Sequence, residues 1–222
     1  MITESFALDG RTVRLCGDGE PEILFLQPAD AGETLPPETM RSCSVPFVLA
    51  SFEVKDWNRD LSPWEAPPVF GKIPFGGGAA DTLAFLTERL LPELRARLGL
   101  RDDVKLCVGG YSLAGLFALW AASRTEEFDA VAAASPSVWF PGWLDYCRTH
   151  PILAGNVYLS LGDREERTKN PVMARVGDCM RELETLLRAD HTVTLEWNPG
   201  GHFQDPAGRT ARAFCRVAAL ER

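Results

Sequence analysis

A succession of short apolar runs separated by helical patterns constrains the fold of this chain more than any other feature. Six runs have about the length of a β-strand: residues 22–26, 46–54, 104–108, 130–134, 156–161 and 192–197. They are continuously apolar rather than cleanly alternating, which is typical of strands covered on both faces. Strands that alternate with helices predict an α/β fold, with a mostly parallel central sheet flanked by helices.

The first helical pattern covers residues 81–98 and places leucines on one face. Asp81 or Thr82 is expected to cap its start, and Gly99 is expected to end it. Pro92 lies inside the pattern and should kink the helix or divide it, because proline lacks the N–H that a helix interior needs.

Three further helices and an N-terminal hairpin complete the expected architecture. The helices are predicted over residues 113–123, along the stripe Val176, Met180, Leu183 and Leu187, and over residues 206–220. Residues 5–8 and 12–15 are expected to pair as a hairpin across Asp9 and Gly10, since this dipeptide favours a two-residue hairpin turn.

Length and charge narrow the class of protein. The 222 residues are expected to form a single domain over residues 1–222. The net charge of −8 argues against a nucleic-acid-binding protein, and no basic stripe indicates a membrane-bound one. The chain shows neither an export signal nor an apolar run of bilayer length. Its six cysteines are scattered, which predicts free thiols and a cytosolic location.

The segment after the third run carries the strongest catalytic signal. The sequence GGYSLAG, residues 109–115, joins this run to the next predicted helix. A nucleophile elbow needs a strand, a tight turn with a serine at its tip, and a helix. Gly110 and Ala114 flank Ser112 and are small enough for strand and helix to pass closely, so the pattern is GxSxA rather than GxSxG. Ser112 is the predicted nucleophile; the alternative is a glycine-rich turn with an idle serine.

A serine nucleophile needs a base, and His202 is the best placed of the three histidines. It lies in NPGGHF, residues 198–203, directly after the last apolar run. A serine followed late in the chain by the histidine is the order found in hydrolases with a nucleophile elbow. His150 and His191 lie in polar connections and are expected at the surface.

A carboxylate should orient the histidine and stabilise its cation. Its expected place follows the strand between serine and histidine, where residues 162–166 read GDREE. Glu165 ranks first because it lies three residues after the glycine that ends the strand. Asp163 ranks second and Glu166 third, and a solvated charged loop is the alternative for all of them.

The remaining candidate site residues also follow apolar runs. The backbone N–H groups of Leu113 and Ala29 are expected to form the oxyanion hole, because these residues follow the nucleophile and the first run. Trp57, Arg59 and Trp139 are candidate substrate-binding residues, the tryptophans for a flat or apolar acyl group and the arginine for an anionic part. Structural packing is the alternative role of the tryptophans.

Motifs for other chemistries are absent from the sequence. There is no GxxxxGK[ST] loop, no GxGxxG, no HExxH and no cluster of cysteines and histidines. The glycines at 76–78 precede a helix but lack the lysine and the strand of a phosphate-binding loop. We therefore expect neither a cofactor nor a metal.

Four characteristic segments follow one another along the chain: GGYSLAGLFALW (109–120), ASPSVWF (134–140), YLSLGDREE (158–166) and GGHF (200–203). This combination resembles the putative esterase family of the α/β-hydrolase superfamily, the branch with enterochelin-esterase-like and S-formylglutathione-hydrolase-like proteins. The resemblance covers roughly residues 22–220. It implies an α/β-hydrolase fold, the roles given above for Ser112 and His202, an acid from the 163–166 loop, and carboxylic-ester hydrolysis.

Two departures from the family pattern stand out. Ala114 replaces the usual glycine, and the acid is ambiguous, since some siderophore-esterase-like members are thought to work as Ser–His dyads. The leading interpretation is a cytosolic serine esterase acting on a small-molecule ester through an acyl-enzyme. A thioesterase or an acyltransferase would use the same serine, and a non-catalytic ligand-binding protein of the same fold is the alternative from another class.

Overall fold

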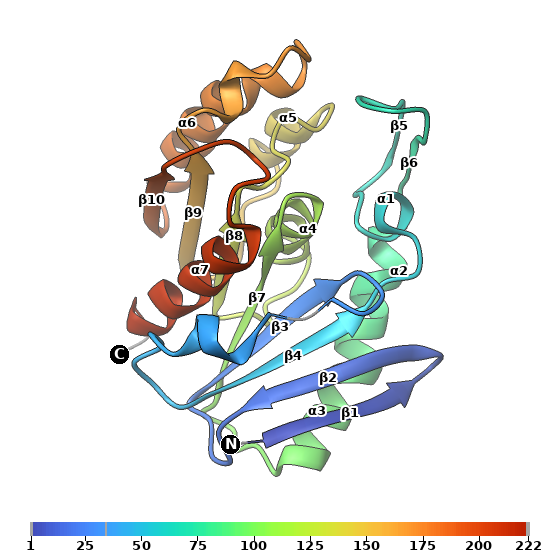
Figure 1. The fold of residues 1–222 in the computed structure, drawn as a ribbon, viewed down its shortest axis with the longest axis vertical. Helices are drawn as coiled ribbons and strands as arrows, with labels where there is room; N and C mark the ends of the chain where they lie inside the picture. The colour runs from blue at the N-terminus through green and yellow to red at the C-terminus, as the bar shows by residue number, and fades with distance from the viewer. Residues whose placement is uncertain (1, 34, 221–222) are drawn as a thin grey trace.

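In the computed structural model, which describes residues 2–33 and 35–220, one eight-stranded sheet runs through the molecule (Figure 1). Its strand order is β1-β2-β4-β3-β7-β8-β9-β10. In this sheet, neighbours from β4 to β10 pair in parallel, whereas β1 with β2 and β2 with β4 pair antiparallel. The predicted mostly parallel sheet is confirmed. The strands are β1 (Ile2–Leu8), β2 (Arg11–Gly17), β3 (Ile23–Ala29), β4 (Phe47–Glu53), β7 (Lys105–Tyr111), β8 (Ala130–Ala134), β9 (Asn156–Gly162) and β10 (Thr192–Asn198).

The predicted N-terminal hairpin is formed by β1 and β2, which pair from Leu8 with Arg11 to Ile2 with Gly17. Its turn residues Asp9 and Gly10 have φ angles of 49° and 71°. Positive φ at both turn positions matches the right-handed twist of the two strands, which is why this dipeptide marks the turn.

Helices cover both faces of the sheet. One face is covered by α7 (Pro206–Leu220), which packs across β7, β8 and β9. The other face carries α4 (Leu113–Ala121) and α6 (Val176–Leu187). All nine residues of α4 are buried, as expected of a short apolar helix next to the central strand.

Strand β8, which lies inside the sheet between β7 and β9, explains why the apolar runs do not alternate. All five of its residues are buried. Val131 and Ala133 belong to the core on the α4 side, and Ala130, Ala132 and Ala134 belong to the core under α7. A strand with a hydrophobic core on each face requires apolar residues at every position.

The helix predicted over residues 81–98 is present but starts earlier. Its first part, α2 (Ala79–Ala84), follows Gly78, and no side chain caps it. Asp81 and Thr82 therefore lie inside the helix, and the prediction that one of them caps its start is wrong. Thr82 instead donates its hydroxyl to the backbone oxygen of Asp60 at 2.7 Å, a buried tertiary contact that no local pattern reveals.

Pro92 is accommodated without ending this helix. A π-helical segment, η2 (Phe85–Leu90), precedes α3 (Leu91–Leu98), and Pro92 is the second residue of α3. The π-helical pattern extends to the residue before the proline, since the N–H of Leu91 donates to the oxygen of Leu86, five residues back. Gly99 ends α3 with a φ of 58°, as predicted.

The segment 56–79, for which no helix or strand was predicted, contains regular structure. It holds α1 and a two-stranded sheet formed by β5 and β6. These elements were not predicted because each has only two to four residues, too few for a periodic signal. The short elements of the chain are η1 (Pro37–Met40), α1 (Trp57–Asp60), β5 (Glu65–Ala66), β6 (Phe75–Gly76), α5 (Trp143–Cys147), η3 (Glu165–Arg167) and η4 (Met173–Arg175).

Two further expectations concern the state of the cysteines and the presence of membrane-spanning segments. All six cysteines are free thiols, as their scattered positions predict. Within residues 2–33 and 35–220, no helix combines the length and apolar character that crossing a bilayer requires.

Candidate active site

Ser112 lies on the turn between β7 and α4, with φ 57° and ψ −118°. Residues other than glycine rarely adopt positive φ, so this backbone is strained. Three hydrogen bonds hold the turn: its N–H donates to the oxygen of Ala134, and its own oxygen accepts from the N–H groups of Leu116 and Ser137. The structure thus holds Ser112 in the geometry of a nucleophile elbow.

Close contact between β7 and α4 accounts for the small residues around Ser112. A Cβ atom on Gly110 would lie 2.6 Å from the Cβ of Ala114. A Cβ on Gly115 would lie 3.1 Å from both the oxygen of Gly110 and the Cβ of Pro136. Because position 110 is glycine, alanine fits at position 114, and the GxSxA pattern forms the elbow.

His202 contacts Ser112 and Glu165 through its two ring nitrogens. Its Nε2 lies 3.0 Å from the Ser112 Oγ, and its Nδ1 lies 2.7 Å from the Glu165 Oε2. An ionised carboxylate can only accept a hydrogen bond, so Nδ1 carries the proton and donates it. This leaves Nε2 as the acceptor for the Ser112 hydroxyl, which is the tautomer that a general base requires.

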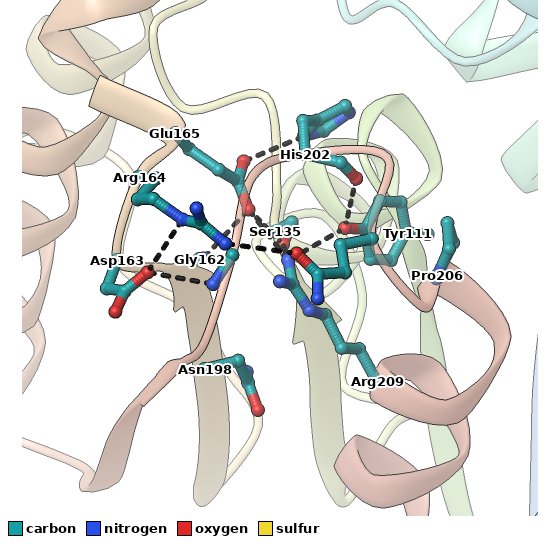
Figure 2. A network of polar contacts seen from close by, with 12 residues as sticks. Tyr111, Ser135, Gly162, Asp163, Arg164, Glu165, Asn198, His202, Pro206 and Arg209 are labelled. Carbon is teal, nitrogen blue, oxygen red and sulfur yellow. Dashed lines mark hydrogen bonds and ion pairs between the residues drawn. The ribbon is translucent and has the colours of Figure 1, made fainter. Parts of the chain in front are cut away.

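Glu165 is buried, and its second oxygen accepts three hydrogen bonds (Figure 2). Its Oε1 accepts from the Ser135 hydroxyl at 2.7 Å, the Gly162 N–H at 2.8 Å and the Arg209 Nη1 at 3.1 Å. Burial raises the pKa of Glu165, but the hydrogen bonds from His202, Ser135 and Gly162 outweigh it, so the pKa lies below its ordinary value. The carboxylate is therefore ionised at neutral pH.

The other two candidate carboxylates lie in different contacts. Asp163 accepts a hydrogen bond from the N–H of Gly200 at 2.8 Å, which ties the end of β9 to the loop that carries His202. Glu166 pairs with Arg181 at 3.3 Å. Of the three, the structure brings Glu165 alone to the His202 ring.

A cavity of about 250 Å³ opens beside His202. Phe203, the residue after His202, is 90% exposed there, which is unusual for a phenylalanine. The wall of this cavity combines apolar side chains with two guanidinium groups. The apolar lining residues are Trp139, Met173, Val176 and Phe203, and the cationic ones are Arg164 and Arg167.

The three predicted substrate-binding residues do not lie together. Trp139 lines the cavity beside His202. Trp57 lines a separate hollow together with Phe70 and Ile73. Arg59 pairs with Asp60 and Asp81, each at 3.3 Å, so neighbouring carboxylates engage its charge. A role of Trp57, Arg59 and Trp139 in substrate binding stays a prediction.

The two residues predicted for the oxyanion hole occupy the ends of neighbouring elements. Leu113 is the first residue of α4, where a backbone N–H has no acceptor within the helix. Ala29 is the last residue of β3, and its oxygen accepts from the N–H of Val54 at 3.0 Å. Their joint function as an oxyanion hole stays a prediction.

Sequence reasoning missed the polar residues that surround Glu165. Arg209 is the chief of these, with a side chain only 2% exposed. A signal for it exists: Ala213 and Val217 follow at four-residue intervals on α7, so Arg209 continues an apolar row and faces the sheet. Tyr111 and Ser135 gave no such signal, since Tyr111 is the last residue of β7 and Ser135 follows β8, where side chains commonly face solvent.

Two curated relatives share 32% identity with parts of this chain. One is a siderophore enterobactin esterase of Emericella nidulans, matched over 129 residues, 51% of this chain and 40% of the relative. The other is a siderophore triacetylfusarinine C esterase of Aspergillus fumigatus, matched over 93 residues, 41% of this chain and 31% of the relative. The matched part of the chain spans less than half the length of either relative.

A solved structure extends the likeness to nearly the whole chain. The siderophore hydrolase EstB from Aspergillus nidulans superposes with a TM-score of 0.76 at 20% identity, over 97% of this chain and 93% of that protein. The α/β-hydrolase fold expected from the sequence is thereby confirmed. The family described as "Putative esterase" matches residues 42–198, more than half of the chain, a stretch that includes the elbow and Glu165. This chain therefore belongs to the "Putative esterase" family.

Proposed function

We propose that this chain is a serine esterase that hydrolyses a carboxylic ester through an acyl-enzyme. One observation carries the proposal: the Ser112 Oγ lies 3.0 Å from the His202 Nε2, and the Nδ1 of the same ring lies 2.7 Å from the Glu165 Oε2. Nucleophile, base and orienting acid thus form one hydrogen-bonded chain. Membership of the esterase family supports the same reaction class.

The geometry suits the following steps. The Ser112 Oγ attacks the ester carbonyl carbon while its proton passes to the His202 Nε2, and Glu165 stabilises the resulting imidazolium. The N–H groups of Leu113 and Ala29 hold the tetrahedral oxyanion. His202 then gives the proton to the leaving alcohol. Water, activated by the same histidine, attacks the acyl-enzyme and releases the acid and the free Ser112 hydroxyl.

Fluorophosphonate labelling followed by intact-mass measurement tests the mechanism. Wild type is expected to gain one adduct, Ser112→Ala none, and His202→Ala an adduct only at a rate several orders of magnitude lower. His150→Ala is the matched control, since His150 stacks on Tyr146 away from the site, and it should label as wild type does. Failure of folded wild type to label would contradict the mechanism and favour a non-catalytic binding protein.

The finer proposal is that the ester belongs to a siderophore. The names of the relatives point to this class. The cavity beside His202 fits it, because an apolar wall with Arg164 and Arg167 suits an aromatic or acyl group that carries anionic oxygens.

Chromatographic assays separate this substrate proposal from the reaction class. Enterobactin and triacetylfusarinine C are incubated with wild type and with Ser112→Ala, with p-nitrophenyl acetate as the simple ester. Cleavage of either siderophore by wild type alone is the expected result. If wild type cleaves p-nitrophenyl acetate but neither siderophore, the esterase activity stands and the proposal of a siderophore substrate is contradicted. Faster reaction with a matched thioester, or transfer to an added alcohol, would instead indicate a thioesterase or an acyltransferase.

A further inference from the structure

Arg209 is a cation buried next to the candidate catalytic residues. It lies in the first turn of α7 (Figure 2). Its side chain is only 2% exposed. Burying a guanidinium is costly unless its N–H groups are paired. The partners of Arg209 therefore indicate what the arginine is for.

One group of contacts fixes the acid. The Arg209 Nη1 donates to the Glu165 Oε1 at 3.1 Å and to the Ser135 Oγ at 3.4 Å. The Ser135 hydroxyl itself donates to the same Oε1 at 2.7 Å, and the Gly162 N–H donates to it at 2.8 Å. These donors come from the residue after β8, from the last residue of β9 and from α7, so three separate segments fix the rotation of one carboxylate. Its Oε2 is thereby directed at His202.

A second group of contacts fixes the loop that carries the base. The Arg209 Nη1 donates to the Tyr111 hydroxyl at 3.2 Å, and that hydroxyl donates to the backbone oxygen of His202 at 2.6 Å. The Arg209 Nη2 donates to the backbone oxygen of Pro199 at 2.9 Å. One guanidinium thus contacts the acid directly and reaches the histidine loop at two points.

We propose that Arg209 is a positioning residue for the Ser112–His202–Glu165 chain, which acts by holding the Glu165 carboxylate and the His202 loop in register with each other. This inference rests on the proposed esterase function. Arg209 touches no substrate, and its effect passes through Glu165 and Tyr111. A misplacement of about 1 Å between catalytic groups can cost about 100-fold in rate, so the expected effect is measurable.

The test compares Arg209→Met, Arg209→Lys and Arg212→Met on p-nitrophenyl acetate. Arg212 is the matched control, because it lies one turn further along α7 and bonds to Asn198 rather than to Glu165. Arg209→Met should lower kcat about 100-fold with KM changed less than about threefold, because the arginine positions catalytic groups and binds no substrate. Arg209→Lys should recover part of kcat, and Arg212→Met should match wild type.

The pH profile distinguishes positioning from a role in folding alone. Removing the guanidinium takes a positive charge away from the hydrogen-bonded Ser112–His202–Glu165 chain, which then takes up a proton more readily, so the acid limb of kcat/KM should move to higher pH in Arg209→Met and return towards wild type in Arg209→Lys. A lower melting temperature combined with a wild-type kcat per folded molecule and a wild-type pH profile would overturn the proposal.

A double-mutant cycle with Glu165→Gln provides the second readout. If Arg209 acts through Glu165, adding Arg209→Met to Glu165→Gln should cost much less than it costs in wild type. Equal losses in both backgrounds would overturn the proposal. Should Arg209→Met fail to fold, the cycle is run with Arg209→Lys, for which the same two outcomes decide.

Fluorophosphonate labelling of the same proteins separates the two proposals. Unlabelled wild type contradicts the esterase function and, with it, the role of Arg209. If wild type and folded Arg209→Met label equally fast, the proposed role of Arg209 is contradicted and the esterase function stands. Fast labelling of wild type and about 100-fold slower labelling of Arg209→Met is the expected result.

Discussion

Gly110 and Ala114 lie so close that a Cβ on the glycine would be 2.6 Å from the Cβ of the alanine. Strand β7 and helix α4 approach each other at this point, and only one of the two positions has room for a side-chain atom. The departure of this chain from the GxSxG pattern therefore leaves the elbow intact. Because position 114 carries a Cβ, position 110 must be glycine for β7 and α4 to approach each other this closely.

Gly110→Ala should lower the free energy of unfolding by about 1–3 kcal/mol, the usual cost of overpacking. Adding Ala114→Gly removes the clashing atom, so the double variant should be more stable than the sum of the single effects predicts. Urea unfolding measures all three variants. Gly155→Ala is the control, because a Cβ there would meet nothing within 4 Å. Strict additivity of the two changes would contradict the close approach.

Ser112→Gly should remove activity and stabilise the protein. The serine has a φ of 57°, a strained conformation that glycine adopts without steric cost. Relief of this strain is expected to exceed the entropic cost of glycine and to raise the free energy of unfolding by about 1 kcal/mol. Ser112→Ala is the matched variant, equally inactive but still strained. Equal melting temperatures of the glycine and alanine variants would show that the elbow stores no strain.

Glu165 should make the stability of the protein depend on pH in the acid range. Its pKa in the folded state lies below the ordinary value. Its stabilising contribution is therefore complete above the unfolded pKa of about 4.3 and is lost as the pH falls through the folded pKa. Glu165→Gln lacks this titration, so its free energy of unfolding should fall less steeply than that of wild type below about pH 4.5. Chemical unfolding at a series of pH values measures both slopes, and parallel curves would contradict the lowered pKa.

Arg167 should select for anionic acyl groups. It lines the cavity beside His202, where a guanidinium can pair with a carboxylate or phenolate of the substrate. Arg167→Met should raise KM about tenfold for an ester with an anionic acyl group and leave KM for the neutral analogue unchanged. Arg188→Met is the control, since Arg188 pairs with Glu184 on α6. Equal effects on charged and neutral esters would show that Arg167 does not read the charge of the substrate.

Local sequence patterns identified the parts of the site that depend on chain order. A strand followed by a turn and a helix places Ser112 at a strand end, and the loop after the last strand places His202 beside it. These positions follow from short-range patterns, because consecutive parallel strands deliver their carboxyl ends to one edge of a sheet. The same reasoning missed β5 and β6, which have two residues each and are defined only by pairing with each other.

Such local patterns do not predict which neighbours a charged side chain contacts in the folded protein. Sequence spacing ranked Glu165 above Asp163 and Glu166. The spacing alone, however, allows any of these three carboxylates to face His202. Trp57, Arg59 and Trp139 also looked alike as residues that follow strands. The structure places Trp139 in the cavity beside His202, Trp57 in another hollow, and Arg59 between two aspartates.

The sequence by itself determined the α/β layering, the elbow at Ser112 and the late histidine, because these depend on periodicity and on order along the chain. Only the tertiary structure decided which carboxylate meets His202 and which residues hold that carboxylate. Arg209, Ser135 and Gly162 come from α7, the turn after β8 and the end of β9, far apart in sequence, and they converge on one oxygen of Glu165. Hydrogen bonds act over about 3 Å, so their partners are settled only when packing of the sheet and helices brings distant segments together.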